Sequence, residues 1–199
     1  MKSMPNILTT LRLLACPLII YLVINDLSNN QWASSISSVA AKKIFFVFVI
    51  ASLTDFLDGY LARKKNFKSN FGKFLDPIAD KALIITMLTI IIFYGIDLNF
   101  HKIALFIIIL RELIVSFLRF NLTSLNQSIE VNLLSKYKTF IQILAIGVYL
   151  LHSMDLFHPA FHKRYDFLYS ISIFLFWFSA YITFITGVQH YKTYLKVKK

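Results

Sequence analysis

The sequence predicts an all-α integral membrane protein whose six transmembrane helices form one bundle. The first observation behind this prediction is composition, because a chain that is 57% hydrophobic and only 16% charged is too apolar for a soluble domain. The second is that apolar stretches near the length of about 20 residues needed to cross a bilayer recur six times. These stretches cover residues 7–24, 39–63, 77–94, 103–120, 140–151 and 167–188. We expect a single domain over residues 1–199.

Local sequence features predict where these helices begin and end. The N-terminal apolar run resembles a signal peptide, but no small-residue cleavage site follows and Arg12 interrupts the run, so we expect a retained first helix. A polar loop, residues 25–38, separates it from the second helix. The polar residues 64–71 form the next turn, and Pro77 fits the first turn of the third helix, where its missing N–H is harmless. The fifth stretch is short, and its helix is expected to begin near Ser135.

Basic residues are unevenly divided between the loops, which predicts the orientation in the membrane. One side of the bundle collects Lys2, Lys64, Lys65, Lys68, Lys73, Lys136, Lys138, Lys192, Lys196, Lys198 and Lys199. The other side has Lys102, Lys163 and Arg164, with Lys42 and Lys43 near a helix start. Because Lys and Arg accumulate in cytoplasmic loops, we expect both termini in the cytoplasm. The basic residues that give the net charge of +11 lie beside apolar spans. We therefore expect membrane lipids and phosphorylated substrates as partners and no nucleic acid.

Four of the ten acidic residues lie in one segment. Asp55 and Asp58 are spaced i,i+3 and share one helix face; Asp76 and Asp80 are spaced i,i+4 and share a face of the next helix. Two antiparallel helices would bring these carboxylates together, where they repel one another strongly without a cation. Oxygen ligands with no His or Cys cluster nearby suit Mg²⁺ or Mn²⁺. The alternative of four surface carboxylates is disfavoured by the cost of acids at membrane depth. The expected orientation opens this segment to the cytoplasm.

The full spacing of the acidic segment, D-x2-D-G-x2-A-R-x8-G-x3-D-x3-D, resembles the signature of the CDP-alcohol phosphatidyltransferases at every position. The resemblance implies that family's membrane helix bundle and its reaction, in which a hydroxyl attacks the lipid-side phosphorus of a CDP-lipid and CMP leaves. It implies two divalent ions, with Asp55, Asp58 and Asp76 as ligands. Asp80 would lie near both the metal and the hydroxyl. We expect it to be the general base, although ligation of the second metal, or both roles, stays open.

The resemblance also assigns the CDP-lipid to the small and basic residues of this segment. Gly59 and Ala62 are one turn apart and leave room for the cytidine end, although close helix packing would use the same small residues. Arg63 can bind the pyrophosphate with two parallel hydrogen bonds, or it can be a helix-end cation that snorkels to the headgroups. Gly72 permits the turn into the next helix.

A second group of charges predicts which alcohol is accepted. Arg111 and Arg119 fall on one broad face of the fourth helix, and arginines inside an apolar span are costly and seldom idle. Lys136 and Lys138 follow at the start of the fifth helix. Together they can hold a doubly charged phosphate, which predicts a phosphorylated alcohol. Two alternatives stay open, namely a structural ion pair between Arg111 and Glu112, and lysines that serve only to set the membrane orientation.

Four stretches resemble the bacterial phosphatidylglycerophosphate synthases within this family. They are residues 4–12, 70–81, 111–119 and 136–139. The resemblance implies CDP-diacylglycerol as donor, sn-glycerol 3-phosphate as acceptor, the bacterial inner membrane as location and a homodimer as assembly. Asn6 and Arg12 are expected to reach the nucleotide or the pyrophosphate, with a snorkelling Arg12 as the alternative. Phe117 stands where we expect a small residue, which alters the expected shape of the acceptor pocket.

Two other functions fit part of the pattern. A transferase of the same family with another acceptor, such as a cardiolipin synthase, would share the acidic segment and differ in an acceptor screen. A divalent-cation or small-solute transporter would also carry carboxylates within the membrane. Against the transporter, the acids lie near one side rather than at the midplane, and no pair of matched broken helices is visible.

Overall fold

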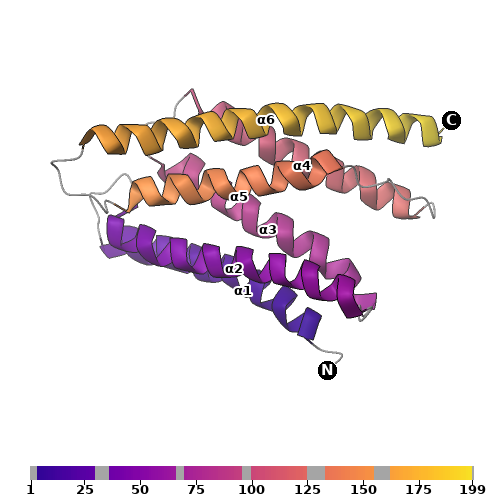
Figure 1. The fold of residues 1–199 in the computed structure, drawn as a ribbon, viewed down its shortest axis with the longest axis horizontal. Helices are drawn as coiled ribbons and strands as arrows, with labels where there is room; N and C mark the ends of the chain where they lie inside the picture. The colour runs from indigo at the N-terminus through magenta and orange to yellow at the C-terminus, as the bar shows by residue number, and fades with distance from the viewer. Residues whose placement is uncertain are drawn as a thin grey trace. The chain divides into compact units, whose positions relative to one another are not determined.

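The part of the chain that the computed structural model describes consists of six α-helices and contains no strand. The described backbone covers residues 4–29, 36–65, 70–95, 100–124, 133–154 and 162–198, and the described side chains cover residues 10–29, 36–54, 79, 81–95, 100–118, 137–154 and 167–195. The helices are α1 Met4–Asn29, α2 Ser38–Lys65, α3 Asn70–Tyr94, α4 Lys102–Ser124, α5 Leu133–Ser153 and α6 His162–Lys198 (Figure 1). Each contains one of the six apolar stretches, so the all-α fold class is confirmed.

Two helices extend well beyond the ends that the sequence predicts for them. α3 begins at Asn70, so Pro77 lies inside the helix and the prediction that it occupies the first turn is wrong. α6 continues to Lys198, because the residues after Val188 are polar but include no Gly or Pro that would end the helix. Hydropathy marks the apolar part of a helix, whereas the hydrogen-bonded backbone continues as long as the local sequence permits.

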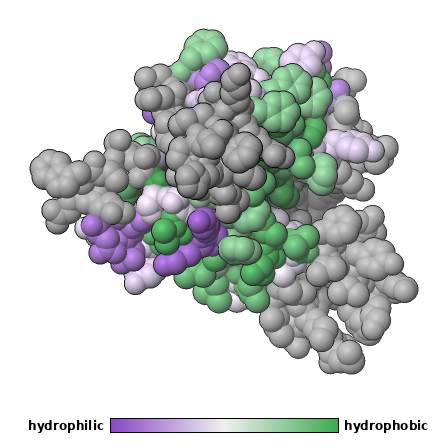
Figure 2. Space-filling view, turned by 60° about the vertical axis from the view of Figure 1, so that its left-hand side comes forward, coloured by the Kyte–Doolittle hydropathy of each residue, from purple (hydrophilic) through white to green (hydrophobic). Residues whose placement is uncertain are grey.

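Long apolar helices are the feature that bears on membrane insertion. Within the described residues, Thr10–Asn29 and Phe167–Leu195 are long and apolar enough to cross a membrane, and Lys81–Tyr94 is a shorter apolar helix. Only 28% and 33% of the apolar windows of the two long segments are buried, whereas core helices of soluble proteins are mostly buried. Figure 2 shows hydrophobic residues over much of the described surface of one face. These features are compatible with a membrane protein; the number of crossings stays a prediction.

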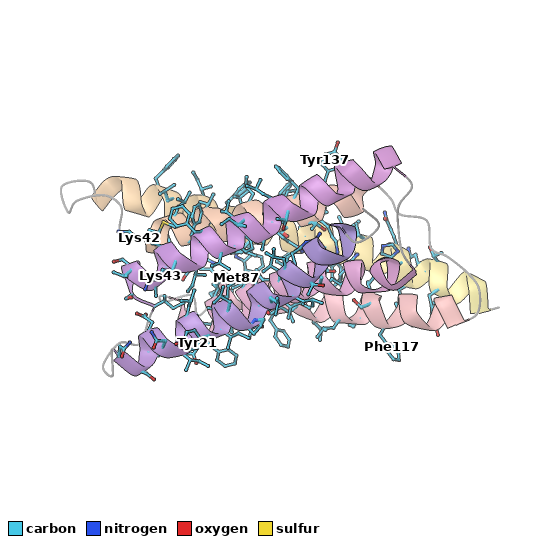
Figure 3. All side chains as sticks on the ribbon, turned by 90° about the horizontal axis from the view of Figure 1, so that it is seen from below. Tyr21, Lys42, Lys43, Met87, Phe117 and Tyr137 are labelled. Carbon is cyan, nitrogen blue, oxygen red and sulfur yellow. The ribbon has the colours of Figure 1, made fainter. Side chains whose placement is uncertain are left out.

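The chain divides into two compact units, Met1–Ile96 with Ile146–Tyr169 and Asp97–Ala145 with Ser170–Lys199. In the first unit, α1 packs against both α2 and α3. Ile19 of α1, Ile44 of α2 and Met87 of α3 are each fully buried, and Figure 3 shows Met87 pointing toward the interior whereas Tyr21 points outward. Apolar packing therefore holds this unit together. The single domain over residues 1–199 stays a prediction.

The carboxylate of Asp26, near the end of α1, binds Ser37 just before the start of α2. Asp26 accepts hydrogen bonds from the Ser37 backbone N–H at 2.8 Å and from the Ser37 hydroxyl at 2.5 Å. The Ser37 hydroxyl oxygen in turn accepts the N–H of Ala40 at 3.2 Å. Ser37 is thus the N-cap of α2, and it satisfies a backbone donor that the first helical turn leaves without a partner.

In the second unit, one face of α6 is buried, and most of its side chains are small or bear a hydroxyl. The buried members of this face are Ser172, Phe176, Ser179, Ala180, Thr183, Thr186 and His190. Small residues let membrane helices approach closely, which compensates for the weak hydrophobic driving force between helices in lipid. Near the start of α4, Trp177 of α6 donates from Nε1 to Nδ1 of His101 at 3.0 Å, and its ring lies 5.6 Å from that of Phe100.

Candidate functional site

The four aspartates of the acidic segment lie on consecutive helices. Asp55 and Asp58 belong to α2, and Asp76 and Asp80 belong to α3. The i,i+3 and i,i+4 spacings therefore place each pair on one face of a helix, as the sequence predicts. The side chains of these aspartates lie outside the described residues. So do the side-chain positions of Asn6, Gly59, Ala62, Arg63, Gly72, Arg119 and Lys136.

The donor set of the acidic segment fits two hard divalent cations. It offers carboxylate oxygens alone, on two helices whose connecting segment is short, since α2 ends at Lys65 and α3 begins at Asn70. Among the residues whose side chains are described, no group of three or more His, Cys, Asp or Glu could hold a metal ion. The two-ion site on α2 and α3 stays a prediction.

A network of buried charges joins α4 to α5 in the second unit. Arg111, Glu112 and Lys138 are exposed by only 7%, 5% and 5%. Arg111 donates from Nη1 to Glu112 Oε1 at 3.2 Å, and Lys138 donates from Nζ to the same oxygen. The ion pair considered from the sequence is therefore present, with Lys138 as a third member. A lysine that only set the membrane orientation would be exposed, so that alternative does not fit Lys138.

The donor groups of this network suit an anionic ligand. A guanidinium and an ammonium lie within reach of one carboxylate, that of Glu112. Arginine and lysine bind oxyanions such as phosphate through charge-assisted hydrogen bonds, and arginine can donate two of them in parallel. The two basic side chains are therefore of the kind that holds a phosphate.

α6 holds the Arg111 side chain from a second direction. Arg111 donates from Nη2 to the Thr186 hydroxyl oxygen at 2.8 Å. That hydroxyl lies 3.0 Å from the carbonyl oxygens of both Ile182 and Thr183, so its hydrogen is donated to the α6 backbone and a lone pair faces the guanidinium. At the next position, a Cβ on Gly187 would lie 3.0 Å from Arg111 Cγ and 3.3 Å from Nε. The arginine therefore rests against the α6 backbone.

Sequence reasoning assigned no site residue to α6. Thr183, Thr186, Gly187 and His190 follow the i, i+3, i+4, i+7 spacing of one helix face, and each is small or polar. That pattern is the signal that could have pointed to a packed polar face. Gln142 of α5 also reaches this face, since its Nε2 donates to the Thr183 hydroxyl at 3.3 Å.

Two further residues singled out from the sequence are described. Arg12 is 2% exposed in the first unit, which does not fit the alternative of a snorkelling side chain; a role toward the nucleotide stays a prediction. Phe117 is 65% exposed and projects outward from α4 (Figure 3), whereas Arg111 and Glu112 of the same helix are buried. The large Phe117 ring therefore does not lie on the face that carries the charge network.

Known proteins are similar to almost the whole chain. The family profile of the CDP-alcohol phosphatidyltransferases matches residues 2–187. A CDP-diacylglycerol–glycerol-3-phosphate 3-phosphatidyltransferase of Rickettsia typhi is 36% identical over 96% of this chain and 97% of its own length. The protein of the same name in Bacillus subtilis is 38% identical over 77% of this chain and 79% of its own length. Profile and relatives together establish that the chain belongs to the CDP-alcohol phosphatidyltransferase family.

Proposed function

We propose that the protein transfers the phosphatidyl group of CDP-diacylglycerol to sn-glycerol 3-phosphate, which yields phosphatidylglycerophosphate and CMP in phospholipid biosynthesis. The observation that carries this proposal is the nearly end-to-end similarity to relatives named for that reaction. The eight-position acidic segment, complete in this chain, agrees with it. So does the buried cationic network, because the acceptor brings a phosphate.

We assign the donor half of the reaction mainly to residues of α2 and α3. Asp55, Asp58, Asp76 and Asp80 would hold two divalent ions, Mg²⁺ or Mn²⁺, whose charge would stabilise the departing phosphate. Asp80 accepts the proton of the attacking hydroxyl as a new bond forms from that oxygen to the lipid-side phosphorus. The bond from this phosphorus to the bridging oxygen breaks, and CMP leaves. The residues proposed to hold the CDP-lipid are Asn6, Arg12, Gly59, Ala62, Arg63 and Gly72.

The acceptor half falls to cations of α4 and α5. We assign the phosphate of glycerol 3-phosphate to Arg111, Arg119, Lys136 and Lys138. Support comes from the two members whose side chains are described, since Arg111 and Lys138 are buried and share a single carboxylate. An uncharged alcohol such as inositol offers no anionic group to the guanidinium of Arg111 and the ammonium of Lys138.

The proposal extends to location and assembly. The protein is a single multi-pass domain in the bacterial inner membrane, with six crossings and with both termini and the active site on the cytoplasmic side. The uneven distribution of Lys and Arg supports the orientation. Exposed aromatic side chains on several helices support contact with lipid. Among them are Phe46, Phe93, Phe106, Phe174 and Phe184. A homodimer is implied by the family resemblance.

The acceptor assignment and the metal requirement are tested with one assay. Purified protein, CDP-diacylglycerol and Mg²⁺ or Mn²⁺ are expected to release CMP only when glycerol 3-phosphate is added. Chelation of the divalent ions is expected to stop the release, and their return to restore it, because the repelling carboxylates and the diphosphate both need them. Mass spectrometry of the lipid product checks the identity of the new phospholipid.

Matched reactions with serine, inositol or phosphatidylglycerol serve as acceptor controls. Equal CMP release with any of these would overturn the acceptor assignment, and release with phosphatidylglycerol would favour a cardiolipin synthase. Divalent-ion flux across liposomes without CMP release would indicate a transporter instead.

A further inference from the structure

The Arg111 side chain is held along its length by α6. Its terminal Nη2 donates to the Thr186 hydroxyl at 2.8 Å, and its Cγ and Nε lie where a Cβ on Gly187 would be only 3.0 and 3.3 Å away. The hydrogen bond fixes the end of the side chain, and the missing Cβ gives its stem a place to lie. Both contacts come from consecutive residues of α6, Thr186 and Gly187. The sequence alone assigned no site residue to this helix.

The chemistry of these contacts suits positioning rather than mere packing. A guanidinium presents its donors in a rigid planar fork, so its orientation decides whether it can bind two phosphate oxygens at once. Glu112 fixes the fork through Nη1, and Thr186 fixes it through Nη2. A long side chain that is already held in place loses little further conformational freedom when a ligand binds.

We propose that Thr186 and Gly187 are positioning residues that orient the Arg111 guanidinium for the phosphate of the acceptor. The inference rests on the proposed function, in which Arg111 binds that phosphate. It adds that α6, through these two residues, sets the affinity for the acceptor and leaves the affinity for the donor lipid unchanged.

Thr186→Val tests the hydrogen bond at nearly constant side-chain shape. The KM for glycerol 3-phosphate is expected to rise by about tenfold, which is the size expected when one hydrogen bond that supports a charged binding group is lost. The kcat and the KM for CDP-diacylglycerol are expected to stay near the wild-type values. The reason is that the variant loses an interaction that stabilises the bound acceptor equally in the ground state and in the transition state. Thr186→Ser, which keeps the hydroxyl, is expected to restore the KM.

Thr193→Val is the matched control on the same helix. Its hydroxyl donates to a backbone carbonyl four residues earlier, that of Gln189 at 3.0 Å, and it is exposed. The control therefore removes a threonine hydroxyl from α6 and leaves the charge network unchanged. Its KM values are expected to equal those of the wild type.

Gly187→Ala tests the contact with the arginine stem. The added methyl group has to displace Arg111 by a few tenths of an ångström, so the KM for glycerol 3-phosphate is expected to rise severalfold. Thermal unfolding is measured alongside to show that the variant stays folded, because the helix propensity gained with alanine is offset by the displacement of Arg111. Gly147→Ala in α5 is the control, because a Cβ there has nothing within 4 Å; it is expected to leave the KM unchanged.

The outcomes separate the positioning role from the proposed function. A wild-type protein that releases no CMP with glycerol 3-phosphate refutes both. An active wild type whose Thr186→Val and Gly187→Ala variants keep the wild-type KM for the acceptor refutes the positioning role alone. So does a pure fall in kcat, or a rise in the donor KM as large as that for the acceptor, since loss of folded protein or a general distortion would account for it.

Discussion

Replacing Asp80 by Asn is expected to lower kcat by about 10² to 10⁴, the contribution typical of a positioned general base. The amide has nearly the same shape as the carboxylate but does not accept the proton of the attacking hydroxyl, and it is a poor ligand for a hard divalent ion. Asp76→Asn is expected to be similarly inactive through loss of a metal ligand. Both variants are expected to insert and fold, because removal of one of four mutually repelling carboxylates relieves repulsion.

CMP release measured at saturating glycerol 3-phosphate checks this prediction. The dependence of the residual rate on the metal concentration distinguishes the metal ligand from the general base. Raising the Mg²⁺ or Mn²⁺ concentration is expected to recover part of the activity of Asp76→Asn. It is expected not to recover the activity of Asp80→Asn, which lacks the proton acceptor. Asp26→Asn is the control, since Asp26 accepts hydrogen bonds from Ser37 in the connection from α1 to α2, outside the acidic segment. Wild-type turnover in Asp80→Asn would contradict its assignment as the base.

Removing the shared carboxylate with Glu112→Ala is expected to destabilise the protein by about 3–5 kcal/mol, the cost typical of breaking a buried ion pair. Arg111 and Lys138 both donate to Glu112 Oε1 and are at least nine-tenths buried. Without Glu112, each of the two cations loses a charge-assisted hydrogen bond in a poorly solvated space. The thermal unfolding temperature in detergent measures the loss.

A set of related variants isolates the electrostatic cause. Lys138→Met removes the hydrogen bond from Lys138 to Glu112 Oε1 and keeps that from Arg111, whereas Glu112→Ala removes both, so Lys138→Met is expected to cost less. In the double variant, the interaction between Lys138 and Glu112 is lost only once, so its cost is expected to fall below the sum of the two single costs. Additive costs, or a Glu112→Ala protein as stable as Lys138→Met, would show that the carboxylate does not hold the two cations together.

The helices were predictable because a helix depends on nearby residues. Each of the six apolar stretches lies within a helix of the structure, and the spacings that pair Asp55 with Asp58 and Asp76 with Asp80 fall on helical backbone. The helix ends were less predictable, because apolarity reports the lipid environment and not the backbone. α3 begins at Asn70 rather than at Pro77 for that reason, since residues 70–76, a mixture of polar and apolar side chains, are already helical.

The members of the charge network were predictable, and the ion pair of Arg111 with Glu112 was among the alternatives that the sequence left open. The contact of Lys138 with the same carboxylate was not predictable, because the two residues are 26 positions apart in the chain. Burial in one small space brings them together, and only tertiary packing creates that space. The contact between Arg111 and Thr186 joins residues far apart in the chain. A threonine beside a glycine has no local feature that identifies such a partner.

The length of α6 has a consequence for how deep the charge network lies. The helix has 37 residues, and at about 1.5 Å per residue it measures roughly 55 Å, whereas the hydrocarbon layer of a bilayer is about 30 Å thick. A helix of that length is either strongly tilted in the bilayer or extends into the water. Its last turns carry Lys192, Lys196 and Lys198. If these ammonium groups rest at the water boundary, Thr186 lies only two to three turns beneath it. A small, hydrated metabolite would then reach Arg111 without having to travel to the centre of the bilayer.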